Sequence, residues 1–340
     1  MAHVLVTGAT GFIASHCMVK LLERGHTVRG TARSTSKSGA LNTLISDYME
    51  TGVEVPLVAA DLSKDSGWAD AVEGVDAILH VASPIPDTLP RDADELIIPA
   101  RDGALRVLRA AKTAGVKRIV MTSSVAAISY GWGDARPDVL NEDHWSNPDN
   151  IKDNTAYTRS KTIAERAAWD YVKGEGVGLE LTTINPSAVL GPVMGADFSA
   201  SLQIVTQLMQ GKLPAVPHVG FQIVDVRDVA EAHVLAMEND VSIGQRYAVA
   251  DDFMWFTDVA QLLNDAYPNH PKKIPTGQMP NWLLKLMAPI NPPVKQILAE
   301  LGKHRFVSTE KVRTELGWTP LSAREAVLAA ADSLVRHKVV

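Results

Sequence analysis

Residues 3–14 read HVLVTGATGFIA, and this stretch decides the fold. Its opening HVLV is largely apolar, as in a buried strand, and apolar residues at helical spacing follow Gly11. Gly8 permits a tight turn, Gly11 lets the backbone approach a pyrophosphate, and Ala14 still allows the helix to pack closely on the strand. The stretch therefore predicts a nucleotide-binding turn between a first strand and a first helix.

Strands and helices alternate through the first half of the chain. The expected strands are 3–7, 27–31, 54–59, 77–81, 118–122 and 179–184, and the clearest helices are 12–24, 94–114 and 155–172. Such alternation is typical of a parallel sheet covered by helices on both faces. We therefore expect an α/β protein with a doubly wound parallel sheet, the Rossmann fold, and a smaller C-terminal substrate domain.

The pattern loosens beyond residue 186, where prolines become frequent, and a chain of 340 residues has room for two domains. The expected boundaries are 1–186 plus about 221–250 for the Rossmann domain, and 187–220 plus 251–340 for the substrate-binding domain. A strand at 223–226 and a helix at 227–237 should return the chain to the main sheet.

The net charge and the cysteine content limit which binding partners and which cellular compartment we expect. A net charge of −6 creates no overall field that favours nucleic acid or an anionic membrane, and no apolar run is long enough to cross a bilayer. Cys17 is the only cysteine, so no intrachain disulfide can form and a reducing compartment is indicated. We expect a cytoplasmic monomer or homodimer that binds neither nucleic acid nor membrane.

The end of the second strand selects the cofactor. An NAD site usually places an acidic residue there for the ribose 2′-hydroxyl, yet residues 26–39 contain none. Arg33 follows the strand directly, and Lys37 lies four residues further in a Ser/Thr-rich loop. A guanidinium and an ammonium suit a 2′-phosphate, so the sequence predicts NADP(H).

Two further strand ends carry candidate cofactor contacts. Asp61 and Leu62 end the third strand, where a carboxylate could accept a hydrogen bond from the adenine amino group. Val81, Ala82 and Ser83 end the fourth strand, where a small-residue backbone would let the cofactor pass.

A tyrosine and a lysine mark the candidate catalytic site. Tyr157 and Lys161 are four residues apart, on one face of the helix expected at 155–172. The preceding fifth strand ends in two serines, Ser123 and Ser124. Because the carboxyl ends of parallel strands share one edge of the sheet, these side chains are expected to meet the cofactor there.

Carbonyl reduction explains this set of residues. It requires a hydride on carbon and a proton on oxygen, and a free tyrosine with a pKa of about 10 is a poor acid–base catalyst. The ammonium of Lys161 should lower the pKa of Tyr157 and also hydrogen-bond the nicotinamide ribose. A serine would orient the carbonyl; we assign Ser124, with Ser123 as its rival. These residues predict an NADP-dependent oxidoreductase acting on small-molecule carbonyls or, in reverse, on alcohols.

These motifs resemble the extended short-chain dehydrogenases/reductases, in the group of dihydroflavonol 4-reductase, cinnamoyl-CoA reductase and methylglyoxal (aldehyde) reductase. The resemblance covers most of the chain and includes the segment His80–Pro84. It implies the same catalytic residues and NADP(H) binding. The further cofactor contacts that it implies are Gly8, Ala9, Thr10, Gly11, Phe12 and Ile13 in the phosphate turn, Pro186, Ser187 and Val189 beside the nicotinamide, and Ser201.

One departure bears on the substrate. The plant flavonoid reductases carry an Asn where this chain has Ser129, a shorter side chain with fewer hydrogen-bonding groups. The expected lining of the substrate site, with Ile128, Tyr130, Phe221 and the region of Trp282, is largely apolar. Apolar walls with few polar anchors predict broad reduction of aryl and alkyl carbonyls and weak activity on dihydroflavonols.

Two other functions fit the same fold. A sugar-nucleotide epimerase or dehydratase would retain NAD, and Arg33 argues against it. A non-catalytic NADP-sensing protein would not need the Tyr157/Lys161 pair. We expect no metal, because His144, His218 and His233 lack the spacing of metal ligands.

Overall fold

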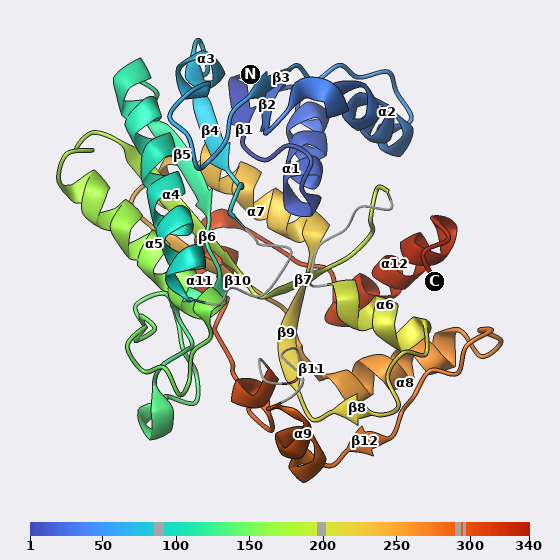
Figure 1. Ribbon diagram of the computed structural model, residues 1–340. Coiled ribbons are helices and arrows are strands. Elements are labelled where there is room, and N and C mark those ends of the chain that lie inside the picture. Colours follow the sequence, from blue (N-terminus) through green and yellow to red (C-terminus); the bar gives the residue numbers. More distant parts are fainter. Residues whose placement is uncertain (85–91, 196–201, 290–293, 295–296) are drawn as a thin grey trace.

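The computed structural model describes residues 1–84, 92–195, 202–289, 294 and 297–340 (Figure 1). Its centre is a seven-stranded parallel sheet in the order β10-β6-β5-β4-β1-β2-β3. The strands are β1 His3–Val6, β2 Thr27–Ala32, β3 Leu57–Ala59, β4 Ala77–His80, β5 Arg118–Thr122, β6 Glu180–Pro186 and β10 Arg246–Val249. The order reverses between β1 and β4, so the predicted doubly wound sheet is confirmed.

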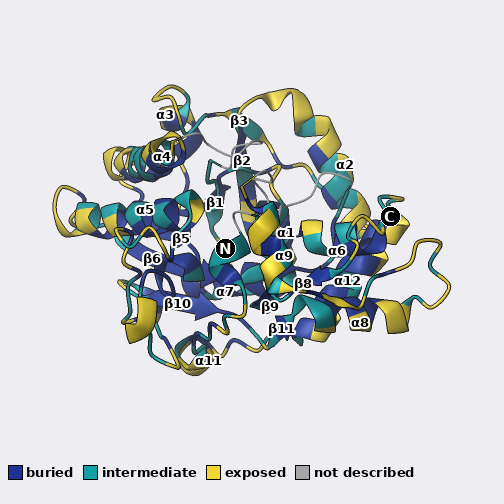
Figure 2. Cartoon of the chain, turned by 60° about the horizontal axis from the view of Figure 1, so that its bottom comes forward, coloured by how far each residue is buried: buried dark blue, intermediate teal, exposed yellow. Residues whose placement is uncertain are grey.

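Helices cover both faces of this sheet. They are α1 Phe12–Glu23, α2 Ser38–Met49, α3 Trp68–Val72, α4 Asp94–Ala114, α5 Ala156–Lys173 and α7 Val226–Glu238. Alternate strand residues serve opposite faces: Val4 and Val6 pack with α1 and α7, while Leu5 packs with α3 and α4. All three are fully buried, as expected for a parallel sheet covered on both sides. Figure 2 shows β6 and β10 of the same sheet coloured as buried.

The remaining elements surround a second core. β7 Ala188–Leu190, β9 Gly220–Asp225 and β11 Phe253–Trp255 form a three-stranded sheet, and β8 Val216–Pro217 pairs with β12 Gln278–Met279. The helices are α6 Gln203–Met209, α8 Phe256–Ala266, α9 Asn281–Met287, α11 Glu310–Leu316 and α12 Ala323–Arg336. Short 3₁₀ turns are η1 Thr35–Lys37, η2 Val125–Ala127, η3 Gly133–Ala135, η5 Asp240–Ser242 and η6 Leu298–Glu300. Apolar residues of α6, α8 and α12 pack together beside β7 and β9.

Two expectations about strands were wrong. The strand expected at 223–226 does not return to the main sheet: β9 lies between β7 and β11, and β10 extends the main sheet beside β6. A short buried run looks the same whichever sheet it joins, so its partner cannot be inferred from the run itself. The third strand starts at Leu57, not at residue 54, just after Pro56, which has no N–H to donate. The domain boundaries stay a prediction.

Within the described residues, no helix has the length and apolar character needed to span a membrane. The same residues contain no group of three His, Cys, Asp or Glu side chains placed to hold a metal ion.

Candidate active site

The phosphate turn has the geometry expected of it. Gly8 adopts φ +68°, and a Cβ added there would lie 3.0 Å from the Cβ of Ala82, so a side chain is excluded. Gly11 N donates to the carbonyl of Gly8 at 2.8 Å and is the N-cap residue of α1. No side chain among the described residues caps this helix, so its first N–H groups are suited to an anion.

A contact that the sequence analysis missed joins this turn to the end of β4. The hydroxyl of Thr7 accepts from the N–H of Ala82 at 3.0 Å and lies 2.9 Å from Nδ1 of His80. Burial lowers the pKa of His80 to about 3, with the charge of Lys161 adding to this, so the imidazole is neutral. The tautomer of His80 sets which of the two groups, the Thr7 hydroxyl or Nδ1, donates in this hydrogen bond. Only the pairing of β1 with β4 brings these residues together.

Arg33 and Asp61 lie together beyond the ends of β2 and β3. Ser63 donates two hydrogen bonds to the same oxygen of Asp61, one from its N–H and one from its hydroxyl, each at 2.8 Å. They lower the pKa of Asp61, and the charge of Arg33 contributes to the same shift. Arg33 and Lys37 are exposed, while Leu62 is half-buried and would contact a side chain added at Gly103 on α4.

Ser124, Tyr157 and Lys161 converge. Thr155 caps α5, and Tyr157 and Lys161 follow on one face, with Lys161 Nζ 5.9 Å from the centroid of the Tyr157 ring. The side chain of Ser124 lies close enough to the phenol of Tyr157 to lower its pKa. Tyr157 keeps 42% of its surface exposed, whereas Lys161 and Ser124 keep 8% each. The tyrosine is therefore the member of the set most open to a substrate.

Burial controls the titration of this group. It raises the pKa of Tyr157, which the nearby side chain of Ser124 lowers in part. Lys161 is not among the groups that shift this pKa, so the expected effect of its ammonium on Tyr157 stays a prediction. Desolvation also lowers the pKa of Lys161 to about 8, against the opposing charge of Glu165. At neutral pH the phenol is protonated and the amine is mostly charged.

The two candidate serines point in different directions. Ser123 donates its hydroxyl to the buried carboxylate of Glu165. Ser124 is the N-cap residue of η2, where its oxygen accepts from the N–H of Ala126 at 3.1 Å, and it is the serine that lowers the pKa of Tyr157. The geometry thus favours Ser124 over Ser123 beside the phenol.

The segment after β6 approaches the same place. Ser124 Oγ lies 3.4 Å from the carbonyl of Pro186, to which it can donate. The hydroxyl of Ser187 is buried without a hydrogen-bond partner among the described residues, which suits a polar group of a bound cofactor. Val189 is buried within β7, and Ser201 lies outside the described residues.

The expected substrate lining needs correction. Ile128 is fully buried in a core cluster with Leu140 and Val307, so it cannot line a substrate site.

Ser129 is 1% exposed, and its hydroxyl donates to the carbonyl of Val125 at 3.0 Å. Tyr130 is also buried, with the guanidinium of Arg305 4.2 Å from its ring centroid. Phe221 and Trp282 are less buried, and Trp282 is 67% exposed.

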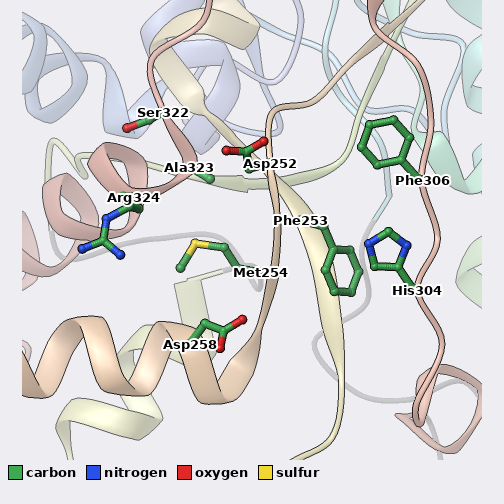
Figure 3. Close-up of a pocket in the computed structure, with 9 residues that line it drawn as sticks. All are labelled: Asp252, Phe253, Met254, Asp258, His304, Phe306, Ser322, Ala323 and Arg324. Carbon is green, nitrogen blue, oxygen red and sulfur yellow. The ribbon is translucent and has the colours of Figure 1, made fainter.

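A separate cavity of about 450 Å³ opens beside β11 and the start of α12 (Figure 3). The ring of Phe253 lies 4.2 Å from that of His304, and Asp252, Asp258 and Arg324 add charges of both signs. None of the predicted catalytic or cofactor residues lines it.

Known proteins are similar to this chain over most of its length. The model of the NAD dependent epimerase/dehydratase family matches residues 4–250. Tetraketide alpha-pyrone reductase 2 of Arabidopsis thaliana is 35% identical over 277 residues, covering 80% of this chain and 84% of that protein. Cinnamoyl-CoA reductase 1 of the same plant is 38% identical over 270 residues, covering 79% and 76%.

A solved structure agrees with these relatives. Yeast methylglyoxal/isovaleraldehyde reductase Gre2, complexed with NADPH, matches with a TM-score of 0.78 at 28% identity, over 99% of this chain and 100% of that one. The fold, the phosphate turn and these similarities agree with the resemblance inferred from the motifs. The chain belongs to the NAD dependent epimerase/dehydratase family.

Proposed function

We propose that this protein is an NADPH-dependent reductase of aldehydes and ketones in which Tyr157 donates the proton. The observation that carries the proposal is the convergence of Ser124, Tyr157 and Lys161 at the carboxyl end of the sheet. The family and its named reductases support an NADP-dependent oxidoreductase. The free, buried thiol of Cys17 supports a cytoplasmic location, where thiols stay reduced. We also propose that the protein is a monomer or a homodimer.

The residues present fit the cofactor. The turn Gly8–Ile13 would hold the pyrophosphate on the N-terminus of α1. Arg33 and Lys37 would hold the 2′-phosphate, and Asp61 and Leu62 would face the adenine. The backbone of Val81, Ala82 and Ser83 would follow the cofactor toward Pro186, Ser187 and Val189 at the nicotinamide end, with the buried hydroxyl of Ser187 as a donor to it.

The chemistry then follows from this chain's own groups. NADPH, when bound, supplies the hydride that adds to the carbonyl carbon. Ser124 donates a hydrogen bond to the carbonyl oxygen, and Tyr157 transfers its phenolic proton to that oxygen, so that an alcohol results. The ammonium of Lys161 stabilises the phenolate that remains.

Carbonyl reduction should slow as the pH rises above about 8. Desolvation lowers the pKa of Lys161 to about 8, so the ammonium that stabilises the phenolate is present below this pH and is lost above it. The measurement is the rate of NADPH oxidation at saturating carbonyl, from about pH 6 to about pH 10. A rate that stays constant across this range would contradict the role of Lys161.

Arg33→Ala should weaken NADPH binding about tenfold and leave NADH binding nearly unchanged, because one charge-assisted contact to the 2′-phosphate is lost. Dissociation constants for both cofactors, measured by fluorescence titration, check this. Arg24→Ala is the matched control, since Arg24 pairs with Glu231 and Glu238 away from the turn. An equal loss for both cofactors would show that Arg33 does not contact the phosphate.

The direct test of the function is a panel of carbonyls assayed with NADPH. We expect broad reduction of aryl and alkyl aldehydes and ketones, because Ser129, bonded to Val125, offers a substrate no free hydroxyl. Dihydroflavonols should be weak substrates, and an advantage of about a hundredfold in kcat/KM for a dihydroflavonol would contradict this. Absence of turnover with every carbonyl, together with tightly retained NAD, would favour an epimerase or dehydratase. NADP binding without any turnover would favour a sensing protein.

A further inference from the structure

A buried carboxylate lies one turn beyond the catalytic lysine. Glu165 has no exposed surface, and it continues the face of α5 that carries Tyr157 and Lys161 at intervals of four residues. Its two oxygens accept hydrogen bonds from Asn185 Nδ2 at 2.7 Å, Arg246 Nε at 2.7 Å, Thr183 Oγ1 at 3.0 Å, Trp169 Nε1 at 3.3 Å and the hydroxyl of Ser123. Such a set of donors joins α5 to the ends of β5 and β6.

Asn185 carries this connection on to the catalytic serine. It is fully buried, and its amide nitrogen donates both to Glu165 and, at 3.0 Å, to the backbone carbonyl of Ser124. Its amide oxygen lies 3.2 Å from Thr183 Oγ1, whose single proton is donated over the shorter distance to Glu165. A carboxylate and a carbonyl only accept, so the orientation of this amide is determined by its partners.

We propose that Glu165 and Asn185 form a positioning pair that holds Ser124 against the helix carrying Tyr157 and Lys161. The proposal rests on the function proposed above, because its consequence is the alignment of Ser124 with Tyr157 for reduction. Among the described residues, neither is hydrogen-bonded to Tyr157. Asn185 bonds to the carbonyl of Ser124, and Glu165 acts on Ser124 through Asn185. Since an error of about 1 Å in such an alignment can cost about a hundredfold in rate, the pair should affect kcat.

Charges around the pair keep the carboxylate ionised. Burial raises the pKa of Glu165, but Arg246 and the other donors outweigh it, and the net shift is downward. Arg246 is itself buried, with its guanidinium 3.6 Å from the ring centroid of Trp145. A buried ion pair costs desolvation and is weak evidence for stability alone. Two of the donors to Glu165 are tied to Ser124, since Ser123 precedes it and Asn185 bonds to its carbonyl, and this points to a role in geometry.

Asn185→Ala compared with Thr183→Val tests the proposal. Each variant removes one donor to Glu165, but only Asn185→Ala severs the bond to the carbonyl of Ser124. We expect Asn185→Ala to lower kcat about thirtyfold or more, with the Kd for NADPH within about twofold, and Thr183→Val to keep kcat within about threefold. Equal effects of the two variants on kcat would overturn the proposal.

Glu165→Gln provides a second variant. If its amide oxygen keeps accepting from Arg246, its NH₂ meets the NH₂ of Asn185, and Asn185 must turn away from Ser124. The loss in kcat should match that of Asn185→Ala, and the double variant should be no slower than the worse single variant, because one connection is broken. Additive losses would mean that the two residues act separately, against the proposal. Circular dichroism and melting curves identify any variant that fails to fold.

Amide hydrogen exchange at Ala126 and Ala127 supplies a readout that needs no turnover. These residues follow Ser124 in η2, so release of its carbonyl should speed their exchange in Asn185→Ala and not in Thr183→Val. If the wild-type protein reduces no carbonyl, the proposed function fails, and the exchange rates still decide the positioning. Unchanged exchange in both Asn185→Ala and Glu165→Gln would overturn the positioning role of Glu165 and Asn185.

Discussion

Tyr157→Phe should lower kcat by about a thousandfold while the Kd for NADPH stays within about twofold, because the substitution removes only the proton donor. The phenylalanine ring keeps the place of the tyrosine ring on α5, next to Lys161, so the cofactor site is left intact. The measurements are steady-state NADPH oxidation with a carbonyl that the wild type reduces, and cofactor binding by fluorescence.

Tyr171→Phe is the matched control for this prediction. Tyr171 lies near the end of the same helix, where Arg109 stacks on its ring at 5.9 Å, away from Ser124. It should leave kcat within about twofold. Retention of more than about a tenth of wild-type activity by Tyr157→Phe would assign the proton to another group.

Lys161→Ala should lower kcat about a hundredfold and also weaken NADPH binding about tenfold, because its ammonium stabilises the phenolate and is proposed to hold the ribose. The same two measurements separate these effects. A change in only one of the two parameters would exclude the dual role. Lys173→Ala, at the exposed end of α5, is the control and should alter neither.

The stability of Lys161→Ala provides a check on this interpretation. Burial lowers the pKa of Lys161 from its ordinary value of 10.5 to about 8. Below pH 8 the buried, charged side chain therefore destabilises the folded state. This destabilisation disappears as the pH rises from about 8 to 10.5, because the unfolded state then also loses the proton. Near neutral pH the variant should therefore melt at a temperature close to or above that of the wild type. A large fall in melting temperature would mean that lost activity reflects unfolding.

Local patterns predicted the regular elements well. The helix expected at 94–114 and the strand expected at 118–122 have these same bounds in the structure, because each has a strong period and a clear end, such as Gly115 after α4. The strand at 220–225 was assigned to the wrong sheet, since β9 pairs with β7 and β11 through contacts that local periodicity does not encode.

The candidate site divides in the same way. Gly8, Tyr157 and Lys161 could be named from the sequence, because a phosphate turn and a helical i, i+4 pair are local patterns that chemistry requires at short spacing. The choice between Ser123 and Ser124 needed the structure, which turns Ser123 toward Glu165 and Ser124 toward Tyr157. Neighbouring residues of an extended segment face opposite ways, and which way each one faces depends on register.

By itself, then, the sequence determined the doubly wound fold, the glycine turn before the first helix and the spacing of Tyr157 and Lys161, because each depends on residues a few positions apart. Only the tertiary structure decided what surrounds them. Ile128 lies in the core instead of the substrate site, and Glu165 meets Asn185 across twenty positions of chain. The physical reason is that burial, desolvation and hydrogen bonding between distant segments depend on how strands pair, and that pairing is set by the packing of the whole molecule.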